Sequence, residues 1–440
     1  MNYKKLMIEA ENQGFSDLEI YESYNRNLTI NVFNSKVDKN EQSTLIAITI
    51  RAIYQGKMAS LHLENNKEKI SFILENLKKN ATSLTTEEEF FIFSGSPSYP
   101  KLEKYDLDFE DYSTADKLSL VLQVEDAVKK SDARIIMVPY CQYTEEITSV
   151  KIINSKGLNI KKTNAFAGLL VQAVAREGSD SQSSFEIQIK HKVKDLDPKT
   201  ISKTVVKKAL EMLNAKPVAS KEYPVVIENE AMSNLLMVYQ NIFSGEAAIK
   251  KITPLLNKIG ETIASPLISI IDAPLNKEAI MNHPFDDEGV ACYDKEVIKE
   301  GKFVTFLHNL KTAYYFKTES TGNGFKIGAN VGVKGANLHI APGKVDKQTM
   351  ISSISEGLLI TVLDGLHAGV NPISGDFSLK ASGFLINNGK LTRPVSLIVI
   401  AGNFFSLLKE VETVGSDLYF SYYGVGSPSI KLAKIAVSGE

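Results

Sequence analysis

The chain has 440 residues, of which 43% are hydrophobic and 23% are charged, and its formal net charge is −2. These values are typical of a soluble globular protein of two domains, and they exclude a polybasic nucleic-acid-binding surface. Two cysteines, Cys141 and Cys292, are too few for a disulfide framework, and residues 1–15 lack the apolar core of a signal peptide, so we expect a cytoplasmic protein.

The N-terminal half mixes helical and strand patterns. Apolar residues at helical spacing predict helices over 3–13, 67–77, 114–130 and 201–213. Alternating apolar residues predict strands over 18–23, 28–33, 44–53, 135–139, 147–153 and 168–175. Residues 80–114, with two prolines and an acidic cluster, are predicted to form a long surface connection. Consecutive strands between helices favour an α+β domain with mostly antiparallel strands, over 1–215, rather than a doubly wound parallel sheet.

The segment 216–221 is the best candidate for a linker, because Pro217 ends the preceding helix and small polar residues follow it. The second predicted domain, 222–440, begins with a strand over 224–227 and helices over 229–243 and 246–251. Short strands and glycine turns follow, which favour a β-rich barrel-like or sandwich-like domain with a few helices. The apolar run 395–408 is too short and too often interrupted by polar residues to span a membrane.

The most informative stretch is 284–324. It opens with an acidic turn, Asp286-Asp287-Glu288-Gly289, and continues with strands predicted over 296–299 and 303–308 around a turn at Gly301. Asn309 suits the N-cap of a helix over 310–316. The stretch ends in a loop whose glycines and asparagine tolerate positive φ, Ser320-Thr321-Gly322-Asn323-Gly324.

The order of these parts, FDDEG, a hairpin, a short helix and STGN, resembles the TldD/PmbA family, formerly called modulators of DNA gyrase. A second block supports the resemblance: NPISGDFS at 371–378, ASGF at 381–384, NNGK at 387–390 and RPVS at 393–396. Within the family, the sequence looks like the PmbA (TldE) branch. The strong motifs lie between residues 284 and 403.

The resemblance implies a metallopeptidase system. Members of its TldD branch carry HExxxH on a helix and a cysteine near the C-terminus, which are understood to hold a metal for peptide hydrolysis. By position, the matching run here is Asn229-Glu230-Ala231-Met232-Ser233-Asn234, with asparagine at both histidine positions. A neutral amide oxygen is a poor substitute for imidazole at a zinc site, and no cysteine follows Cys292. We therefore expect no catalytic residue, no metal site and no cofactor in this chain, with zinc only in a TldD-like partner.

Three groups of residues are candidates to line a cavity or hold a peptide: Asp286, Asp287, Glu288 and Gly289; Ser320, Thr321, Gly322 and Asn323; and Gly375 with Asp376. The acidic turn could also bind a cation, although carboxylates that cap backbone N–H groups are the simpler interpretation. The glycine-rich and acidic zone around Asp376 is typical of tight turns. Glu230, without a metal, is expected to be a solvated or capping carboxylate.

The favoured function is a pseudo-enzyme subunit that pairs with a TldD-like paralogue, forms a homodimer when alone and acts on unfolded or modified peptides, without nucleic-acid or membrane partners. The run 395–408 could supply an apolar contact surface, although a core strand is its simpler use. One alternative is an active metallopeptidase whose ligands are not recognisable in the sequence. Another is a regulator linked to a toxin–antitoxin system or to DNA gyrase.

Overall fold

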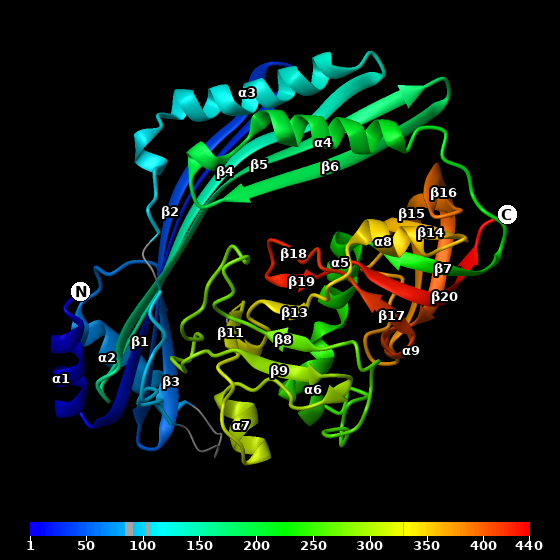
Figure 1. Cartoon of the computed structure of the whole chain (residues 1–440). Coiled ribbons are helices and arrows are strands. Elements are labelled where there is room, and N and C mark those ends of the chain that lie inside the picture. Colours follow the sequence, from blue (N-terminus) through cyan, green and yellow to red (C-terminus); the bar gives the residue numbers. More distant parts are fainter. Residues whose placement is uncertain (84–90, 103–104, 329) are drawn as a thin grey trace.

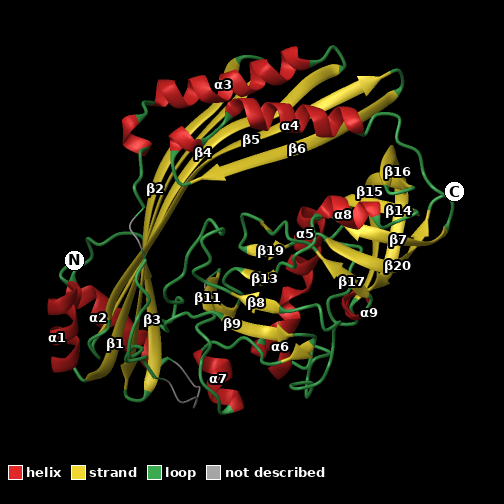
Figure 2. Cartoon of the chain, viewed as in Figure 1, coloured by secondary structure: helices red, strands yellow, loops and turns green. Residues whose placement is uncertain are grey.

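The computed structural model describes residues 1–83, 91–102, 105–328 and 330–440. The chain is α+β, as predicted, with an arched antiparallel sheet in the N-terminal half and a β-rich C-terminal part beneath the arch (Figure 1). Helices cover the arch at both of its ends, and strands dominate the C-terminal part (Figure 2). Part of the predicted long connection, 84–90 and 103–104, lies outside the described residues.

The arch is one six-stranded sheet of order β3-β2-β1-β4-β5-β6, with every neighbouring pair antiparallel. Its strands are β1 (Phe15–Phe33), β2 (Lys36–Tyr54), β3 (Lys57–Leu63), β4 (Ile135–Asn154), β5 (Asn159–Glu177) and β6 (Asp180–Lys190). The predictions of separate strands over 18–23 and 28–33, and over 135–139 and 147–153, are wrong, because each pair is one continuous strand. Their middle residues are half-buried on both faces, so the alternation that marks a strand fades there.

Each end of the arch has its own hydrophobic core. Helices α1 (Tyr3–Asn12) and α2 (Ile70–Thr82) cover one end, and α3 (Thr114–Ser131) and α4 (Pro198–Glu211) cover the other. The first core includes Leu6, Ile20, Ile50 and Leu74. The second includes Val121, Tyr143, Leu169 and Val205. Two 3₁₀ turns, η1 (Phe109–Asp111) and η2 (Val193–Asp195), flank the second helix pair. All four helices lie where the sequence predicts them.

The C-terminal part contains a closed five-stranded barrel, which confirms the barrel-like prediction. Its order is β16-β15-β14-β7-β20, and pairing between β16 and β20 closes it. Its strands are β7 (Lys221–Ile227), β14 (Glu356–Asp364), β15 (Asp376–Asn387), β16 (Lys390–Asn403) and β20 (Ile430–Ser438), with β17 (Val411–Val414) beside β20. Helix α5 (Asn229–Tyr239) shares the barrel's core, while α8 (Lys347–Ser352) and α9 (Phe404–Lys409) lie around it.

A second sheet of the C-terminal part faces the arch, with order β10-β9-β8-β13-β19-β18. Its strands are β8 (Ile270–Asp272), β9 (Lys295–Lys299), β10 (Lys302–Phe303), β13 (Leu338–Ile340), β18 (Tyr419–Phe420) and β19 (Val425–Ser427). The remaining elements are η3 (Gln240–Phe243), α6 (Gly245–Ile249), α7 (Leu310–Phe316), β11 (Gly324–Ile327) and β12 (Asn330–Val333).

The hairpin and the capped helix predicted within 284–324 are present. Glu300 and Gly301 form the turn, with φ values of 44° and 81°, and Asn309 caps α7 in a reciprocal capping box with Thr312. The strand predicted over 303–308 is wrong beyond Phe303. The chain leaves the sheet there because the backbone of Leu307 bonds instead to Phe243 and Gly245.

Segment 216–221 connects the arch to the barrel, and contacts from the C-terminal part hold it. The guanidinium of Arg393 donates to the carbonyls of Lys216 at 3.0 Å and Pro217 at 2.9 Å. The backbone N–H of Glu440 donates to the carbonyl of Val218, whose side chain is buried. Of the described helices, none is both long and apolar enough to cross a bilayer.

Replacing Arg393 with alanine should loosen this connection. The loss of two charge-assisted hydrogen bonds from a half-buried side chain should lower the free energy of unfolding by about 1–2 kcal/mol. It should also speed cleavage of residues 216–221 by subtilisin, followed by mass spectrometry. Arg134→Ala, which removes a partly exposed ion pair of the arch, is the control. Equal cleavage rates in both variants would contradict the proposed restraint.

Candidate functional site

The acidic turn 286–289 lies where the C-terminal part meets the arch, and its first carboxylate holds the turn together. Asp286 is fully buried, and its Oδ1 accepts the backbone N–H groups of Glu288 at 3.0 Å and Val290 at 2.9 Å. Its Oδ2 accepts the N–H of Gly324 at 2.8 Å. Burial raises the pKa of Asp286 to about 8, against the effect of these three donors. The side chain thus ties the turn to the STGN loop.

The second carboxylate of the turn, Asp287, reaches the arch. Its Oδ1 lies 3.3 Å from the ammonium of Lys162 on β5, and its Oδ2 accepts the backbone N–H of Lys326 at 2.9 Å. It also receives a hydrogen bond from Tyr21 on β1. Burial opposes the ionisation of Asp287, but Lys162 and the N–H of Lys326 outweigh it and hold its pKa below the ordinary value.

Lys162 is itself buried at this junction. Its ammonium donates to the carbonyl of Phe285 at 2.8 Å and lies 5.0 Å from the ring centroid of Phe285 and 5.4 Å from that of Phe325. One cation from the arch is therefore enclosed by a carboxylate, a carbonyl and two aromatic faces of the C-terminal part.

The third carboxylate, Glu288, meets the N-terminus of α7. Its Oε2 accepts the backbone N–H of Leu310 at 2.7 Å, a favourable place for negative charge. A Cβ atom at residue 324 would come within 2.4 Å of that oxygen, which explains Gly324. Gly289 has φ of 86°, and a side chain there would strike Leu158 of the arch.

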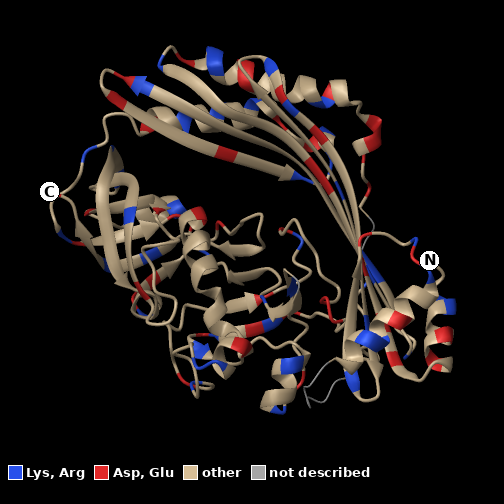
Figure 3. Cartoon of the chain, turned by 180° about the vertical axis from the view of Figure 1, so that it is seen from behind, with Lys and Arg blue, Asp and Glu red and all other residues tan. Residues whose placement is uncertain are grey.

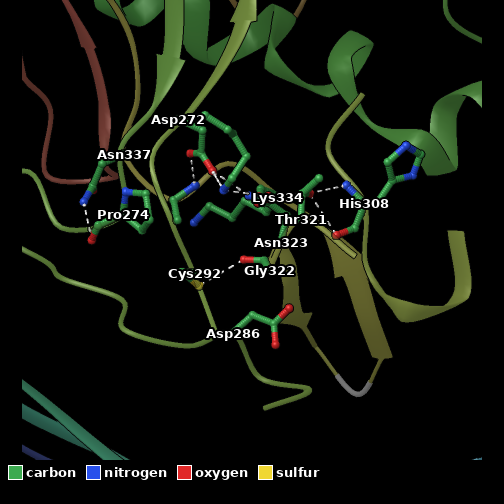
Figure 4. A network of polar contacts seen from close by, with 12 residues as sticks. Asp272, Pro274, Asp286, Cys292, His308, Thr321, Gly322, Asn323, Lys334 and Asn337 are labelled. Carbon is green, nitrogen blue, oxygen red and sulfur yellow. Dashed lines mark hydrogen bonds and ion pairs between the residues drawn. The ribbon is translucent and has the colours of Figure 1, made fainter. Parts of the chain in front are cut away.

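A second buried network lies behind the STGN loop (Figure 4). The ammonium of Lys295 lies 2.9 Å from Asp272 Oδ2 and donates to Asn323 Oδ1 at 3.2 Å, while Asn323 Nδ2 donates to Asp272 Oδ2 at 2.7 Å. Thr321 Oγ1 donates to Asn323 Oδ1 at 2.7 Å. The thiol of Cys292 donates to the carbonyl of Gly322 at 3.0 Å. Both cysteines are buried and free.

The structure therefore brings two of the three candidate groups together, the acidic turn and the STGN loop. Asp286, Glu288, Thr321 and Asn323 are buried, while Ser320 is half-buried. Sequence reasoning missed their partners Lys162, Asp272 and Lys295. Each is a charged residue within a strand that lies 23 or more positions along the chain from its partner, so no local spacing marks the pair.

The third group, Gly375 and Asp376, lies apart from the first two, at the C-terminal end of α5. The hydroxyl of Tyr239 donates to the carbonyls of both residues, at 3.1 Å and 3.0 Å. The Asp376 carboxylate accepts from Asn403 at 2.9 Å and Ser374 at 2.7 Å, and these hydrogen bonds lower its pKa. This is the tight turn with side-chain hydrogen bonds that the composition predicts.

Helix α5 carries the run that matches HExxxH by position. Asn229, its first residue, donates from Nδ2 to the carbonyl of Asp417 at 2.8 Å, and its backbone N–H donates to Ser429 Oγ at 3.2 Å. Asn229 Oδ1 accepts the N–H of Glu230 at 2.7 Å. Both polar atoms of the Asn229 amide are therefore used in hydrogen bonds that fix the start of the helix. Asn234, one and a half turns on, is half-buried.

The side chain of Glu230 points toward the arch and makes its ion pair there. Its carboxylate lies 3.5 Å from the ammonium of Lys208 on α4, which also contacts Glu186 on β6 at 2.7 Å. Two amides and one ion-paired carboxylate do not form a zinc donor set. Across the described residues, no three His, Cys, Asp or Glu side chains are grouped as a metal site requires. The side chains at α5 therefore do not fit the metal that the resemblance places there.

The buried pair of Asp272 and Lys295 should dominate the stability of this region. Replacing Lys295 with methionine leaves the Asp272 carboxylate buried without a counter-ion, so the free energy of unfolding in urea should fall by about 3–5 kcal/mol. The double variant with Asp272→Asn should lose less. Lys299→Met on the same strand removes an exposed pair with Glu296 and should leave stability near that of the wild type. If Lys295→Met and Lys299→Met lower the free energy of unfolding by the same amount, the buried pair contributes no more to stability than an exposed one.

Comparison with known proteins places the whole chain in one family. Models of the PmbA/TldA metallopeptidase match domain 1 over residues 18–81, the central domain over 107–213 and the C-terminal domain over 220–439. The metalloprotease PmbA homolog of Haemophilus influenzae is 28% identical over 78% of this chain and 73% of its own. The metalloprotease PmbA of Escherichia coli O157:H7 is 26% identical over 75% and 71%.

Two solved structures share the complete fold. A candidate modulator of a DNA gyrase from Thermotoga maritima has a TM-score of 0.92, with 30% identity over 99% of both chains. TldE from Thermococcus kodakarensis has a TM-score of 0.89, with 24% identity over 99% of this chain and 100% of its own. With its motifs, its three matched domains and its fold in agreement, the chain belongs to the PmbA/TldD family.

Proposed function

We propose that this chain is a PmbA/TldE-type subunit of a metallopeptidase that acts on unfolded or modified peptides, and that a TldD-like paralogue supplies the catalytic metal. The observation that carries the proposal is that α5 has asparagines, and no histidine, at the two positions where the resemblance places metal ligands. Where the resemblance places ligand histidines, Asn229 uses its amide to anchor the helix to Asp417 and Asn234 offers a second amide. Both groups are neutral, and amide oxygens are weak ligands for zinc.

The surroundings of Glu230 also favour a structural role for this carboxylate over a catalytic one. A general base in a metallopeptidase acts on a metal-activated water. Here the carboxylate is 3.5 Å from Lys208, and that contact links α5 to the arch. We infer that Glu230 contributes to holding the arch over the C-terminal part, while the paralogue carries out hydrolysis.

Peptide contact by the candidate residues stays a prediction. Side chains such as Asp286 and Asn323 are occupied by internal hydrogen bonds, so their contribution would be to shape the wall that a peptide meets. Ser320 and Asp376 are the more exposed members. Backbone groups of the short strands facing the arch could pair with an extended peptide without reading its side chains.

One observation favours a second candidate function. Glu230 is retained at the position of the catalytic glutamate and its side chain is 45% exposed, so an active metallopeptidase with other ligands is the alternative, in keeping with the names of the relatives.

A regulatory role is suggested by the name of the Thermotoga relative. Lysine, arginine, aspartate and glutamate are interspersed along both parts of the chain (Figure 3), and its formal net charge is −2, which is unlike the strongly basic balance typical of nucleic-acid-binding domains.

Metal analysis separates the two candidates. The purified chain, dialysed and analysed by inductively coupled plasma mass spectrometry, should hold far less than one zinc ion per chain and should not cleave unfolded peptides. Mixed with a TldD-like paralogue, it should form a complex that cleaves them. Stoichiometric zinc in the isolated chain, removed by a chelator together with peptidase activity, would refute the proposal.

A substitution at Glu230 tests its role within that complex. Glu230→Gln keeps the size of the side chain and removes the charge that faces Lys208. The complex should cleave peptides at a rate within about twofold of the wild type, because no proton transfer depends on this carboxylate; a general base typically contributes about 10²–10⁴-fold. Lys208→Met should behave in the same way. A loss greater than tenfold in Glu230→Gln alone would show that the carboxylate takes part in the chemistry.

A further inference from the structure

Behind the STGN loop, one buried carboxylate contacts both an amine and an amide. Asp272 ends β8 and Lys295 begins β9, and the two residues lie opposite each other where these strands pair. Asp272 Oδ2 accepts from the ammonium of Lys295 at 2.9 Å. The same oxygen accepts from Nδ2 of Asn323 at 2.7 Å (Figure 4). The side chains of Lys295 and Asp272 are 5% and 0% exposed, and Asn323 is also buried. An amine and an amide nitrogen therefore meet at a single oxygen atom, away from water.

The amide of Asn323 is held in one orientation between these two groups. Its Oδ1 lies 3.2 Å from Nζ of Lys295 and accepts from Thr321 Oγ1 at 2.7 Å. Thr321 is itself fixed, because its Oγ1 accepts the backbone N–H of His308 at 2.6 Å. Nδ2 of the amide also donates to the carbonyl of Lys334 at 2.9 Å. The amide carbonyl therefore faces the amine, and the amide nitrogen faces the carboxylate.

This arrangement contains what the attack of an amine on an amide requires. An amine attacks only in its neutral form, and a carboxylate beside it can remove its proton. A donor on the carbonyl oxygen stabilises the negative charge that forms there during the attack. A carboxylic acid beside the amide nitrogen can protonate that nitrogen as it leaves. Groups held in contact and in a fixed orientation react far faster than the same groups free in solution. Asp272, Thr321 and Lys295 occupy the places that this reaction needs.

We propose that Lys295 and Asn323 are joined by an intramolecular isopeptide bond, and that Asp272 transfers the protons. Nζ passes one proton to Asp272, and the neutral amine attacks Cγ of Asn323, whose carbonyl electron pair moves to Oδ1. Asp272 then gives its proton to Nδ2 and takes a second one from Nζ. The carbonyl re-forms, the Cγ–Nδ2 bond breaks, and ammonia leaves.

The atoms and charges of this step balance. An ammonium and a side-chain amide carry five hydrogens between them. Three of these leave with ammonia, one stays on the new amide and one stays on Asp272. The carboxylate and the ammonium neutralise each other, which a buried site favours because it disfavours charge. The reaction therefore needs no oxidant, reductant or further reactant.

The bond ties the STGN loop to the sheet that faces the arch. It joins the first residue of β9 to the residue before β11, and the ring of chain that it closes contains β10 and α7. A covalent link between distant residues restricts the unfolded chain, as a disulfide does. Metal content and peptide cleavage do not enter the argument, so the bond can stand or fall separately from the proposed function.

A second reaction of Asn323 gives the same loss of ammonia. In an Asn-Gly sequence the backbone nitrogen of the glycine can attack the side chain and form a succinimide. The N–H of Gly324 donates to Asp286 Oδ2 at 2.8 Å, which engages that nitrogen. The amine of Lys295 is therefore the nucleophile that the structure favours, and the experiment has to distinguish the two products.

Mass spectrometry of the denatured full chain tests the bond. The wild type should be lighter than its sequence mass by about 17 Da, the mass of ammonia. Trypsin should leave Lys295 uncut and release one branched peptide that joins residues 278–299 to residues 318–326. A succinimide would leave these peptides separate and would be cleaved by hydroxylamine, whereas the isopeptide bond resists it.

Two variants identify the groups that react. Lys295→Arg keeps a cation beside Asp272 but replaces the amine with a guanidinium, which is always protonated and is not a nucleophile here. Asp272→Asn keeps the amine and the amide but removes the proton carrier. Both variants should have their full sequence mass and separate peptides, with circular dichroism showing that each is folded. The wild-type mass decides the matter even where a variant does not fold.

The arch supplies a matched control. Lys129 donates to Asn34 Oδ1 at 3.3 Å and to Glu125 at 2.8 Å, so the same three kinds of group are present. Asn34 is exposed, however, and the other oxygen of Glu125 accepts the backbone N–H of Ser35 at 2.8 Å. Water surrounds the amide there and keeps the amine charged, so the peptides that contain Lys129 and Asn34 should stay separate.

Three results would overturn the proposal. The first is a wild type that keeps its full sequence mass after prolonged incubation at 37 °C. The second is a loss of ammonia that peptide mapping traces to a succinimide. The third is a branched peptide in folded Asp272→Asn, which would show that the carboxylate does not transfer the protons.

Discussion

The arrangement of the two parts depends on one buried cation. Lys162 extends from β5 of the arch into the C-terminal part, where Asp287, the carbonyl of Phe285 and two phenylalanine rings surround it. Removing a charge of this size from water costs several kcal/mol, which only close and complementary partners can offset. The acidic turn is therefore held at one place on the sheet of the arch, beside Lys162 of β5.

This constraint gives the motifs a structural meaning. Asp286 accepts three backbone N–H groups, Glu288 occupies the space that a side chain at Gly324 would need, and Asn323 joins the buried pair of Asp272 and Lys295. The residues that carry the family resemblance are thus largely those that assemble the fold. The chemical identity of α5 can change independently, because its side chains are fixed by separate contacts with Asp417 and Lys208.

Local patterns in the sequence were sufficient for much of the fold. Helices α1, α3 and α7, the cap at Asn309 and the hairpin turn at Gly301 follow from spacing within a few residues. Continuous strands of about twenty residues were not predictable, because their middles pass between two cores and lose the alternation. The pairing of Lys162 with Asp287, or of Lys208 with Glu230, also could not be found. Such contacts join residues far apart in the chain, and no local pattern in a single sequence identifies the two residues that will pair.

The order of strands in the barrel has a consequence for how the protein is made. The last strand, β20, lies between β7, the first strand of the C-terminal part, and β16, and pairs with both. During synthesis the barrel cannot close until β20 has left the ribosome, so the edges of β7 and β16 that pair with β20 stay unpaired while the arch can already fold. A nascent chain that has not yet released β20 can therefore have a folded arch beside an open barrel, and its exposure to chaperones and to aggregation falls in that interval.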